Sequence, residues 1–346
     1  MDVENGGVIA AVDEGDTTRF GPEVVAKLVR GSRGSAERAA AALEQSDAVI
    51  LQHEFGIYGG EDGREVLDLV ERLDMPMLVV LHTVLRRPST QQRVIVEALA
   101  QASQAVIVQS EAARARLFEA YELAPELVRV VPHGAPRNVA APTARAPDRR
   151  PVALTWGLLG DGKGIEFAIE ALTLLGDLDP LPRYVIHGRT HPRVAATEGE
   201  AYREGLRARA NTLGVADMVE FDNRYVDRES VLAWIREADV VVMPYRSRDQ
   251  VVSGVLVEAI ASGKPVVATR FPHAVELLAA GSGILVSHED PVAIAAALRE
   301  LLTDEAAAAR ARRVARRQAP RFFWENVAAS YTDLCIALTS RAKATS

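Results

Sequence analysis

Short apolar runs alternate along the chain with longer segments in which apolar residues recur every three or four positions. Nearly continuous apolar runs are typical of strands covered on both faces of a parallel sheet, whereas the longer period indicates amphipathic helices. In the first part of the chain we expect strands at residues 8–12, 48–52, 77–82, 105–109 and 128–131 and helices at residues 63–73, 90–101 and 111–121. This alternation predicts a doubly wound α/β domain with right-handed crossovers.

A segment without apolar periodicity separates this pattern from a second one. Residues 136–151 are rich in Ala, Pro, Thr and Arg, which predicts a linker. After it we expect strands at residues 152–156, 184–187, 219–221, 240–243, 266–269 and 283–286, and helices that begin near residues 164, 198, 228, 254, 291 and 304. The pattern predicts an N-terminal domain of residues 1–137, a linker of residues 138–150 and a second doubly wound domain of residues 151–320.

The last segment, residues 321–346, carries aromatic and aliphatic side chains at helical spacing. We expect a final helix, which either packs locally or returns to the N-terminal domain. Two consecutive doubly wound domains place two sets of strand carboxyl ends opposite one another, and ligands bind at such ends. The sequence thus predicts a ligand site in the cleft between the two domains.

Length and charge narrow the class of protein. With 346 residues, 48% of them apolar and 25% charged, the chain has the composition of a globular protein too long for one ordinary core. The formal charge of −7 is spread over both signs, which gives no electrostatic basis for binding nucleic acid.

Cys335 is the single cysteine, which fits a reducing cytoplasm. No apolar run approaches the roughly 18 residues of a membrane span, so we expect a cytoplasmic protein without a transmembrane segment. Peripheral membrane contact, through the weakly basic segment 30–38, is a less favoured alternative.

The stretch from Gln250 to Ala259 is the most informative part of the sequence. It follows an apolar run and a Pro-Tyr break, and Ser253 can cap a helix that begins at Gly254. Free amides and the helix dipole at such a start favour an anion. Glu258 lies about one turn further on, on a face that can point to the same site. The pattern suits a nucleotide sugar, with its diphosphate on the amides and its hydroxyl groups on the carboxylate.

Several further pieces occur in a recognisable order. They are Gly157-Leu-Leu-Gly-Asp-Gly-Lys-Gly164, His187-Gly-Arg-Thr-His-Pro192, Ala238-Asp-Val-Val-Val-Met-Pro-Tyr245 and Ala261-Ser-Gly-Lys-Pro-Val-Val-Ala268, preceded by Leu81-His-Thr83, Val108-Gln-Ser110 and Val131-Pro-His-Gly134. With these pieces the chain resembles, from about residue 45 to its end, the retaining glycosyltransferases of the GT-B fold, in particular the GT4 group of bacterial mannosyl- and glucosyltransferases. The resemblance implies two Rossmann-like parallel-sheet domains that face a cleft.

The resemblance also implies roles for individual residues. Lys163, in the loop that starts at Gly157, would neutralise the donor diphosphate, and Glu258 would hold the nucleotide ribose. His82 would contact the transferred sugar near its reacting carbon. Backbone amides that would bind the phosphates or the sugar belong to Ser253, Gly254 and Val255. Retention in such enzymes is ascribed to front-face attack, which needs positioning and electrostatic stabilisation and neither a metal nor a bound cofactor.

Three features depart from the family's pattern. Leu158 stands where an arginine usually neutralises the diphosphate, which leaves this charge to Lys163. Arg189 or Arg224 could assist it. Gln250 stands where a glutamate opens the two-glutamate motif, which can alter the preference for the donor sugar. The family's first strand–helix unit is not recognisable, so we expect the N-terminal domain to be shortened at its front.

Other polar residues have competing interpretations. The glycine-rich loop with His53, Glu54 and Gly56 follows a predicted strand, and we interpret it as a loop on the acceptor side. Lys264 lies in a predicted turn and is expected to be solvated, and His133 is expected to have a structural role. No cluster of His and acidic residues has the spacing of a metal site.

The sequence therefore predicts a retaining glycosyltransferase that moves a hexose from a GDP-mannose or UDP-hexose donor to a hydroxyl acceptor. Two alternatives stay open: a GT-B binding or accessory protein that has lost catalysis, and a phosphorylase or epimerase on the same fold. Lys163 and Glu258 favour an active enzyme, whereas Leu158 and the shortened front favour the accessory protein.

Overall fold

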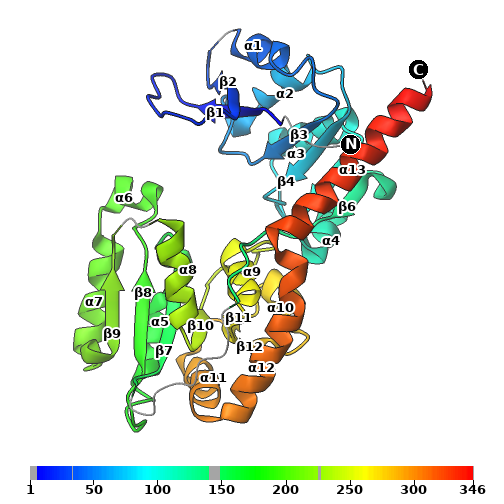
Figure 1. Ribbon diagram of the computed structural model, residues 1–346. Coiled ribbons are helices and arrows are strands. Elements are labelled where there is room, and N and C mark those ends of the chain that lie inside the picture. Colours follow the sequence, from blue (N-terminus) through cyan, green and yellow to red (C-terminus); the bar gives the residue numbers. More distant parts are fainter. Residues whose placement is uncertain (1–5, 33, 140–148, 225–226, 346) are drawn as a thin grey trace. The chain divides into compact units, whose positions relative to one another are not determined.

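The computed structural model describes residues 6–32, 34–139, 149–224 and 227–345. The chain divides into two compact units. Figure 1 shows unit 1 in blue to cyan together with the red end of the last helix, and unit 2 in green to orange. Unit 1 comprises Met1–Pro132 and Val327–Ser346, and unit 2 comprises His133–Asn326. The chain therefore passes between the units twice, once after Pro132 and once within its last helix.

Unit 1 contains six strands within its described residues, and every pair of hydrogen-bonded neighbours is parallel. One sheet pairs β1 (Val8–Val12) with β2 (Val24–Val29). The other has the order β3 (Val49–His53), β4 (Met77–Leu81), β5 (Ala105–Val108) and β6 (Val128–Val130). The helices are α1 (Ser35–Ala41), α2 (Val66–Val70), α3 (Thr90–Ala102) and α4 (Glu111–Ala120), with short 3-10 turns η1 (Glu61–Gly63) and η2 (Pro125–Leu127).

The last helix, α13 (Trp324–Thr345), packs against the four-stranded sheet of unit 1. Val327 is buried with Leu78, Val80 and Ile107, which project from β4 and β5. Further along the helix, Tyr331, Leu334, Cys335 and Leu338 pack against the same cluster. The aromatic and aliphatic residues of this tail thus complete the core of the first unit, although they lie at the end of the chain.

Unit 2 is a six-stranded parallel sheet with the order β12-β11-β10-β7-β8-β9. The strands are β7 (Val152–Trp156), β8 (Arg183–His187), β9 (Val219–Asp222), β10 (Val240–Met243), β11 (Val266–Thr269) and β12 (Gly283–Val286). The chain runs outward from β7 to β9 and then returns to β10 on the other side of β7. The strand order therefore reverses between β7 and β10, which is the place where doubly wound sheets bind ligands.

Helices cover both faces of this sheet (Figure 1). Side chains alternate along β7, so that Val152, Leu154 and Trp156 point to one face and Ala153 to the other. The first face is covered by α8 (Arg228–Glu237), α9 (Gly254–Ala261) and α10 (Pro272–Leu278). The second is covered by α5 (Ile165–Leu172), α7 (Ala201–Thr212) and α11 (Pro291–Thr303). The remaining elements are α6 (Pro192–Glu198), α12 (Glu305–Gln318), η3 (Asp161–Lys163), η4 (Ala216–Met218) and η5 (Ala319–Phe322).

The expectation that Lys264 is solvated is wrong. Its Nζ donates to the carbonyl oxygens of Arg236 at 2.6 Å and Ala238 at 2.8 Å, and so satisfies backbone groups at the end of α8. Burial lowers the pKa of the Lys264 ammonium to about 8, against the opposite influence of Asp239. The turn that contains Lys264 lies beside the end of α8 because β10 and β11 are neighbouring strands. The local sequence does not show which strands are neighbours, so it could not predict this contact.

Candidate functional site

The reversal point of the unit 2 sheet brings two loops together. β7 and β10 are neighbours, so the loop that begins at Gly157 lies beside the loop that leads from β10 to α9. A Cβ atom on Gly157 would lie 3.8 Å from a methyl group of Val255, in the first turn of α9. Gly157 has a φ of 113°, which favours glycine. The two segments that the sequence assigns to donor binding therefore meet at the carboxyl ends of two neighbouring strands.

Lys163 is held in the first of these loops by an aromatic side chain. Its Nζ donates to Tyr245 Oη at 2.9 Å and lies 4.2 Å from the centroid of the same ring. Tyr245 is buried and stacks on Phe271 with a centroid distance of 5.3 Å. The next residue, Gly164, lies so close to the second loop that a Cβ atom there would be 2.1 Å from the carbonyl oxygen of Pro244. The ammonium group is thus half-buried and positioned, and its charge is screened less than on an open surface.

Glu258 is presented at the end of β7. Trp156, the last residue of that strand, donates from Nε1 to Glu258 Oε2 at 3.3 Å. The other oxygen, Oε1, lies 3.6 Å from the guanidinium group of Arg228, and the side chain of Glu258 is 22% exposed. A carboxylate held in this way keeps capacity to accept hydrogen bonds from a diol.

The first turn of α9 offers two amides to a ligand. The hydroxyl group of Ser253 caps the helix by accepting from the amide of Leu256 at 3.3 Å. The Ser253 amide itself donates to Nδ1 of His273 at 2.8 Å, so it is already engaged inside the protein. The amides of Gly254 and Val255 donate to no acceptor within the described part of the chain. These two amides and the helix dipole can therefore receive an anion.

Two further polar side chains at this loop face the protein. Gln250 donates from Nε2 to the carbonyl oxygen of Val252 at 3.1 Å, within its own loop. Burial lowers the pKa of His273 to about 3, and the charges of His133 and Arg321 act in the same direction. A neutral His273 is what the hydrogen bond requires, because Nδ1 accepts from the backbone amide.

His133, which the sequence analysis treats as structural, lies against the first turn of α9. A Cβ atom on Gly254 would be 3.3 Å from both Cε1 and Nε2 of its ring. Nδ1 of His133 lies 2.7 Å from the carbonyl oxygen of Gly134, so it carries a proton and donates it there. Nε2 is the atom left to interact with a group bound in front of α9. His133 and Gly254 are far apart in the sequence, and no local pattern indicates their contact.

The two arginines proposed to assist Lys163 differ in their surroundings. Arg224 forms an ion pair with Asp222 at 2.7 Å. Its guanidinium group is the main cause that lowers the pKa of Asp222 to about 2. Arg189 is exposed and has no ion pair within the described residues, and its carbonyl oxygen accepts from the amide of Leu159 at 2.8 Å. Arg189 thus lies beside the Gly157 loop with an uncompensated charge.

A buried arginine fixes the loop that carries Arg189. Arg203 is 1% exposed, and it donates to the carbonyl oxygen of Gly188 at 2.6 Å and to Glu200 at 2.9 Å. Glu200 also accepts from the hydroxyl group of Thr190 at 2.7 Å. Gly188 in turn lies so close to Gly157 that a Cβ atom would be 1.8 Å from the carbonyl oxygen of Gly157. Arg203 and Glu200 therefore support the Gly157 loop through the neighbouring loop, which contains Gly188 and Thr190. Neither of the two residues was identified from the sequence.

His82, assigned to the transferred sugar, follows β4 in unit 1. Its Nε2 donates to Oε1 of Gln52 at 2.7 Å, and its amide donates to the carbonyl oxygen of His53 at 3.0 Å. The side chain is half-buried. The hydrogen bond to Gln52 fixes the orientation of the imidazole at the end of its strand.

The three acceptor-side residues of the sequence analysis lie at different depths. His53 is fully buried, and burial lowers its pKa to about 4, with the charge of His82 as a smaller cause. Neither ring nitrogen of His53 has a hydrogen-bond partner. Glu54 is half-buried and accepts from the hydroxyl group of Thr83, whereas Gly56 is exposed. The chemistry that this loop can offer to a ligand therefore comes from Glu54 and from the backbone.

Among the described residues, no group of three or more His, Cys, Asp and Glu side chains is arranged to hold a metal ion. The helices of the described part are all too short or too polar to cross a membrane.

Comparison with known proteins fits this geometry. The family model of glycosyl transferases group 1 matches residues 139–318. A D-inositol 3-phosphate glycosyltransferase of Xylanimonas cellulosilytica is 31% identical over 289 residues, which cover 78% of this chain and 68% of the relative. The chain belongs to the group 1 glycosyl transferase family. A family member of the same name from Jonesia denitrificans is 30% identical over 285 residues, 75% of this chain and 65% of that relative. The chain thus spans about two thirds of the length of these curated relatives.

Solved structures identify the fold. The HepE protein of Anabaena, in complex with UDP and glucose, superimposes with a TM-score of 0.72 at 19% identity, over 90% of this chain and 86% of that one. A sucrose-phosphate synthase from Thermosynechococcus elongatus gives a TM-score of 0.71 at 20% identity, over 96% and 88% of the two chains. This group 1 family member therefore has the GT-B fold with two Rossmann-like domains, as the sequence predicts.

Proposed function

We propose that the protein is a retaining glycosyltransferase that moves a hexose from a nucleoside-diphosphate sugar to a hydroxyl acceptor. One observation carries the proposal: the Lys163 loop, the first turn of α9 and the carboxylate of Glu258 all adjoin the end of β7. A diphosphate matches the ammonium group and the free amides, and a ribose diol matches the carboxylate. The UDP bound to HepE makes a uridine nucleotide the first donor to test, with a GDP-linked sugar as the alternative.

In the proposed reaction the acceptor oxygen bonds to the anomeric carbon on the face from which the diphosphate leaves. The bond between the anomeric carbon and the phosphate oxygen breaks, and the acceptor proton passes to the leaving phosphate. Negative charge therefore grows on the diphosphate, where Lys163 and the dipole of α9 stabilise it. We assign His82 to the transferred sugar, and Gln250 to the sugar hydroxyl groups once its side chain leaves its own loop. This scheme uses no metal ion.

The decisive experiment is calorimetry with UDP and GDP, followed by transfer from UDP-glucose or GDP-mannose. Lys163→Ala removes a charge-assisted bond of about 1.5–3 kcal/mol, so nucleotide affinity should fall roughly ten- to hundredfold. Lys27→Ala is the matched control, because Lys27 lies in unit 1. Glu258→Ala should lower donor turnover by about two orders of magnitude. Wild-type binding and turnover in both site variants, or no affinity for either nucleotide, would refute the proposal.

One observation favours a second candidate function. The side-chain amide of Gln250 is hydrogen-bonded into its own loop, and Leu158 is 48% exposed where the family carries a cation. A protein with these two changes can bind a nucleotide without transferring a sugar. Tight UDP or GDP binding, with neither hydrolysis nor transfer from a panel of donors and acceptors, would favour such an accessory protein over an enzyme.

A further inference from the structure

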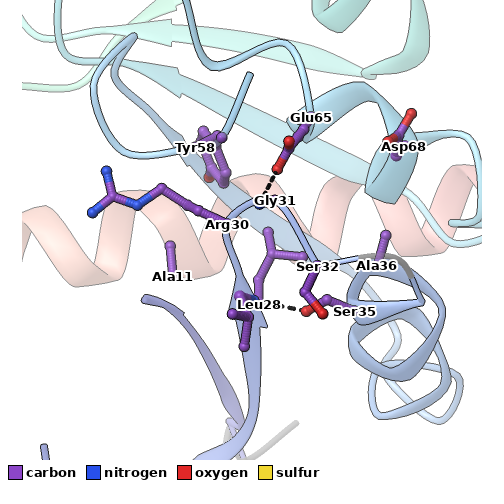
Figure 2. A pocket seen from close by; sticks show the side chains of 12 residues that line it. Ala11, Leu28, Arg30, Gly31, Ser32, Ser35, Ala36, Tyr58, Glu65 and Asp68 are labelled. Atoms are coloured by element: carbon purple, nitrogen blue, oxygen red, sulfur yellow. Dashed lines mark hydrogen bonds between the residues drawn. The ribbon is translucent and has the colours of Figure 1, made fainter. Parts of the chain in front are cut away.

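A pocket of about 110 Å³ lies in unit 1, and none of its described lining residues is among those assigned above to donor binding. It opens at the carboxyl ends of β1 and β2, between the loop after β2, the loop after β3 and α2 (Figure 2). Parallel sheets bind ligands outside the carboxyl ends of their strands. The position of the pocket is therefore that of a ligand site.

Glu65 holds the walls of this pocket together. Its Oε2 accepts from the amide of Gly31 at 2.8 Å, the contact that Figure 2 marks between the residue before α2 and the loop after β2. Its own amide donates to the carbonyl oxygen of Gly59 at 3.0 Å. A Cβ atom on Gly59 would lie 2.0 Å from Glu65 Oε2, so glycine is what makes room for the carboxylate. Three chain segments thus converge on one side chain, and the pocket is formed before any ligand binds.

The lining combines an apolar floor with hydroxyl and carboxylate groups. Leu28 and Ala36 line it together with Tyr58, whose hydroxyl group donates to the carbonyl oxygen of Gln52 at 2.7 Å. The hydroxyl group of Ser32 and the carboxylate of Asp68 also line the pocket, and neither side chain has a partner within the described part of the chain. An apolar surface beside free acceptors matches the CH faces and hydroxyl groups of a sugar or polyol ring.

The charges around the pocket select against an anionic ligand. Arg30 is the one cationic residue among the described lining residues, and it is paired with Asp13 at 2.6 Å and donates to the carbonyl oxygen of Gly56 at 3.2 Å. Figure 2 shows its guanidinium group pointing away from Ser32 and Asp68. Within the described part of the lining, no free cation therefore opposes the carboxylates of Glu65 and Asp68, and these carboxylates would repel a phosphate group.

We propose that this pocket binds an uncharged sugar or polyol unit through Ser32, Glu65 and Asp68. An uncharged unit of this kind differs from the phosphorylated polyol in the name of the curated relatives, D-inositol 3-phosphate glycosyltransferase.

The binding test uses the full chain with UDP present and absent. Saturation-transfer NMR is recorded with myo-inositol, methyl α-glucoside and glycerol, and affinity is then measured for the probe that binds. Asp68→Asn and Ser32→Ala should each weaken that probe at least tenfold and leave UDP affinity unchanged. Glu71→Gln, just beyond the end of α2, is the matched control and should change neither. D-inositol 3-phosphate should bind at least tenfold more weakly than myo-inositol.

Each contrary result overturns the proposal. It fails if none of the three neutral probes binds, if Asp68→Asn binds them as the wild type does, or if the phosphorylated probe binds more tightly. Probe binding is read without turnover, so it stays informative if UDP does not bind and the proposed function fails.

Discussion

At the scale of single residues, the proposed donor site carries one lysine where its family carries two cations. His133 is the side chain placed to compensate, because its Nε2 lies beside Gly254 at the start of α9. Nδ1 is fixed as a donor to the carbonyl oxygen of Gly134, so protonation of Nε2 would give a cation with its second N–H in front of the helix.

His133→Ala should therefore lower nucleotide affinity about tenfold, which corresponds to the loss of one charge-assisted hydrogen bond. His133→Asn keeps a neutral donor and should lose less. Arg137→Ala is the control from the same segment, since Arg137 is exposed and paired with Glu325. Titration calorimetry with UDP measures all three variants, and equal affinities for His133→Ala and the wild type would exclude the histidine from the site.

At the scale of elements, the start of α7 supports the proposed donor loop by holding the loop that follows β8 against it. Arg203 and Glu200 hold Gly188 and Thr190, and Gly188 contacts Gly157. The planar guanidinium group of Arg203 donates to a carbonyl oxygen and to a carboxylate at the same time. The compact ammonium group of a lysine cannot reproduce this geometry. Arg203 is thus a positioning residue for the loop that carries Lys163.

Arg203→Lys should raise the donor KM several-fold while kcat for the bound donor changes little, because the loop loses its position and the reacting groups remain. Arg207→Ala, on the exposed side of the same helix, should leave both constants unchanged. Steady-state kinetics with varied donor, together with a melting curve, separate this effect from a loss of folding. An unchanged donor KM in a folded Arg203→Lys protein would contradict the positioning role.

The elements also show what the sequence can reveal. The strands of unit 2 were predicted nearly to the residue, because burial on both faces produces continuous apolar runs. The strand β2 was missed: Leu28 alone of its residues is buried, and Lys27 interrupts the run. Helix α10 was missed because its seven residues are too few to establish a period.

The candidate site likewise has some residues that the sequence indicates and some contacts that it does not. Ser253 and Glu258 carry local signals, a helix cap and a spacing of about one turn, so the sequence could indicate them. The contact of Trp156 with Glu258 and that of His133 with Gly254 depend on which strands are neighbours. Strand order is set by the whole sheet, and no pattern within a single segment encodes it.

At the scale of the whole molecule, both units bury imidazoles that must stay neutral. Burial lowers the pKa of His53 in unit 1 to about 4. In unit 2 it lowers the pKa of His187 to about 4, against the raising influence of Asp222, and that of His273 to about 3. His187 also stacks on Trp234 at a centroid distance of 3.5 Å. All three side chains contribute to folding only in their uncharged form.

The sign of the pH dependence follows from these pKa values. Between about pH 6.5 and pH 4 these histidines bind protons in the unfolded chain but stay neutral in the folded chain. The free energy of unfolding therefore falls as the pH is lowered. A histidine with a pKa of about 4 in the folded state and about 6.5 in the unfolded state costs roughly 2 kcal/mol at pH 5. Both units should therefore lose stability between pH 7 and pH 5.

Urea unfolding at pH 7 and pH 5 can separate the two units, because Trp156, Trp234 and Trp324 all lie in unit 2. Tryptophan fluorescence then follows unit 2, and circular dichroism follows both. His53→Phe removes a buried imidazole without hydrogen-bond partners from among the rings of Phe55 and Tyr58. In this variant the unit 1 transition should change less between the two pH values, while the fluorescence transition keeps the wild-type shift. If the unit 1 midpoint still moves as far as in the wild type, another group, and not His53, governs the acid sensitivity of that unit.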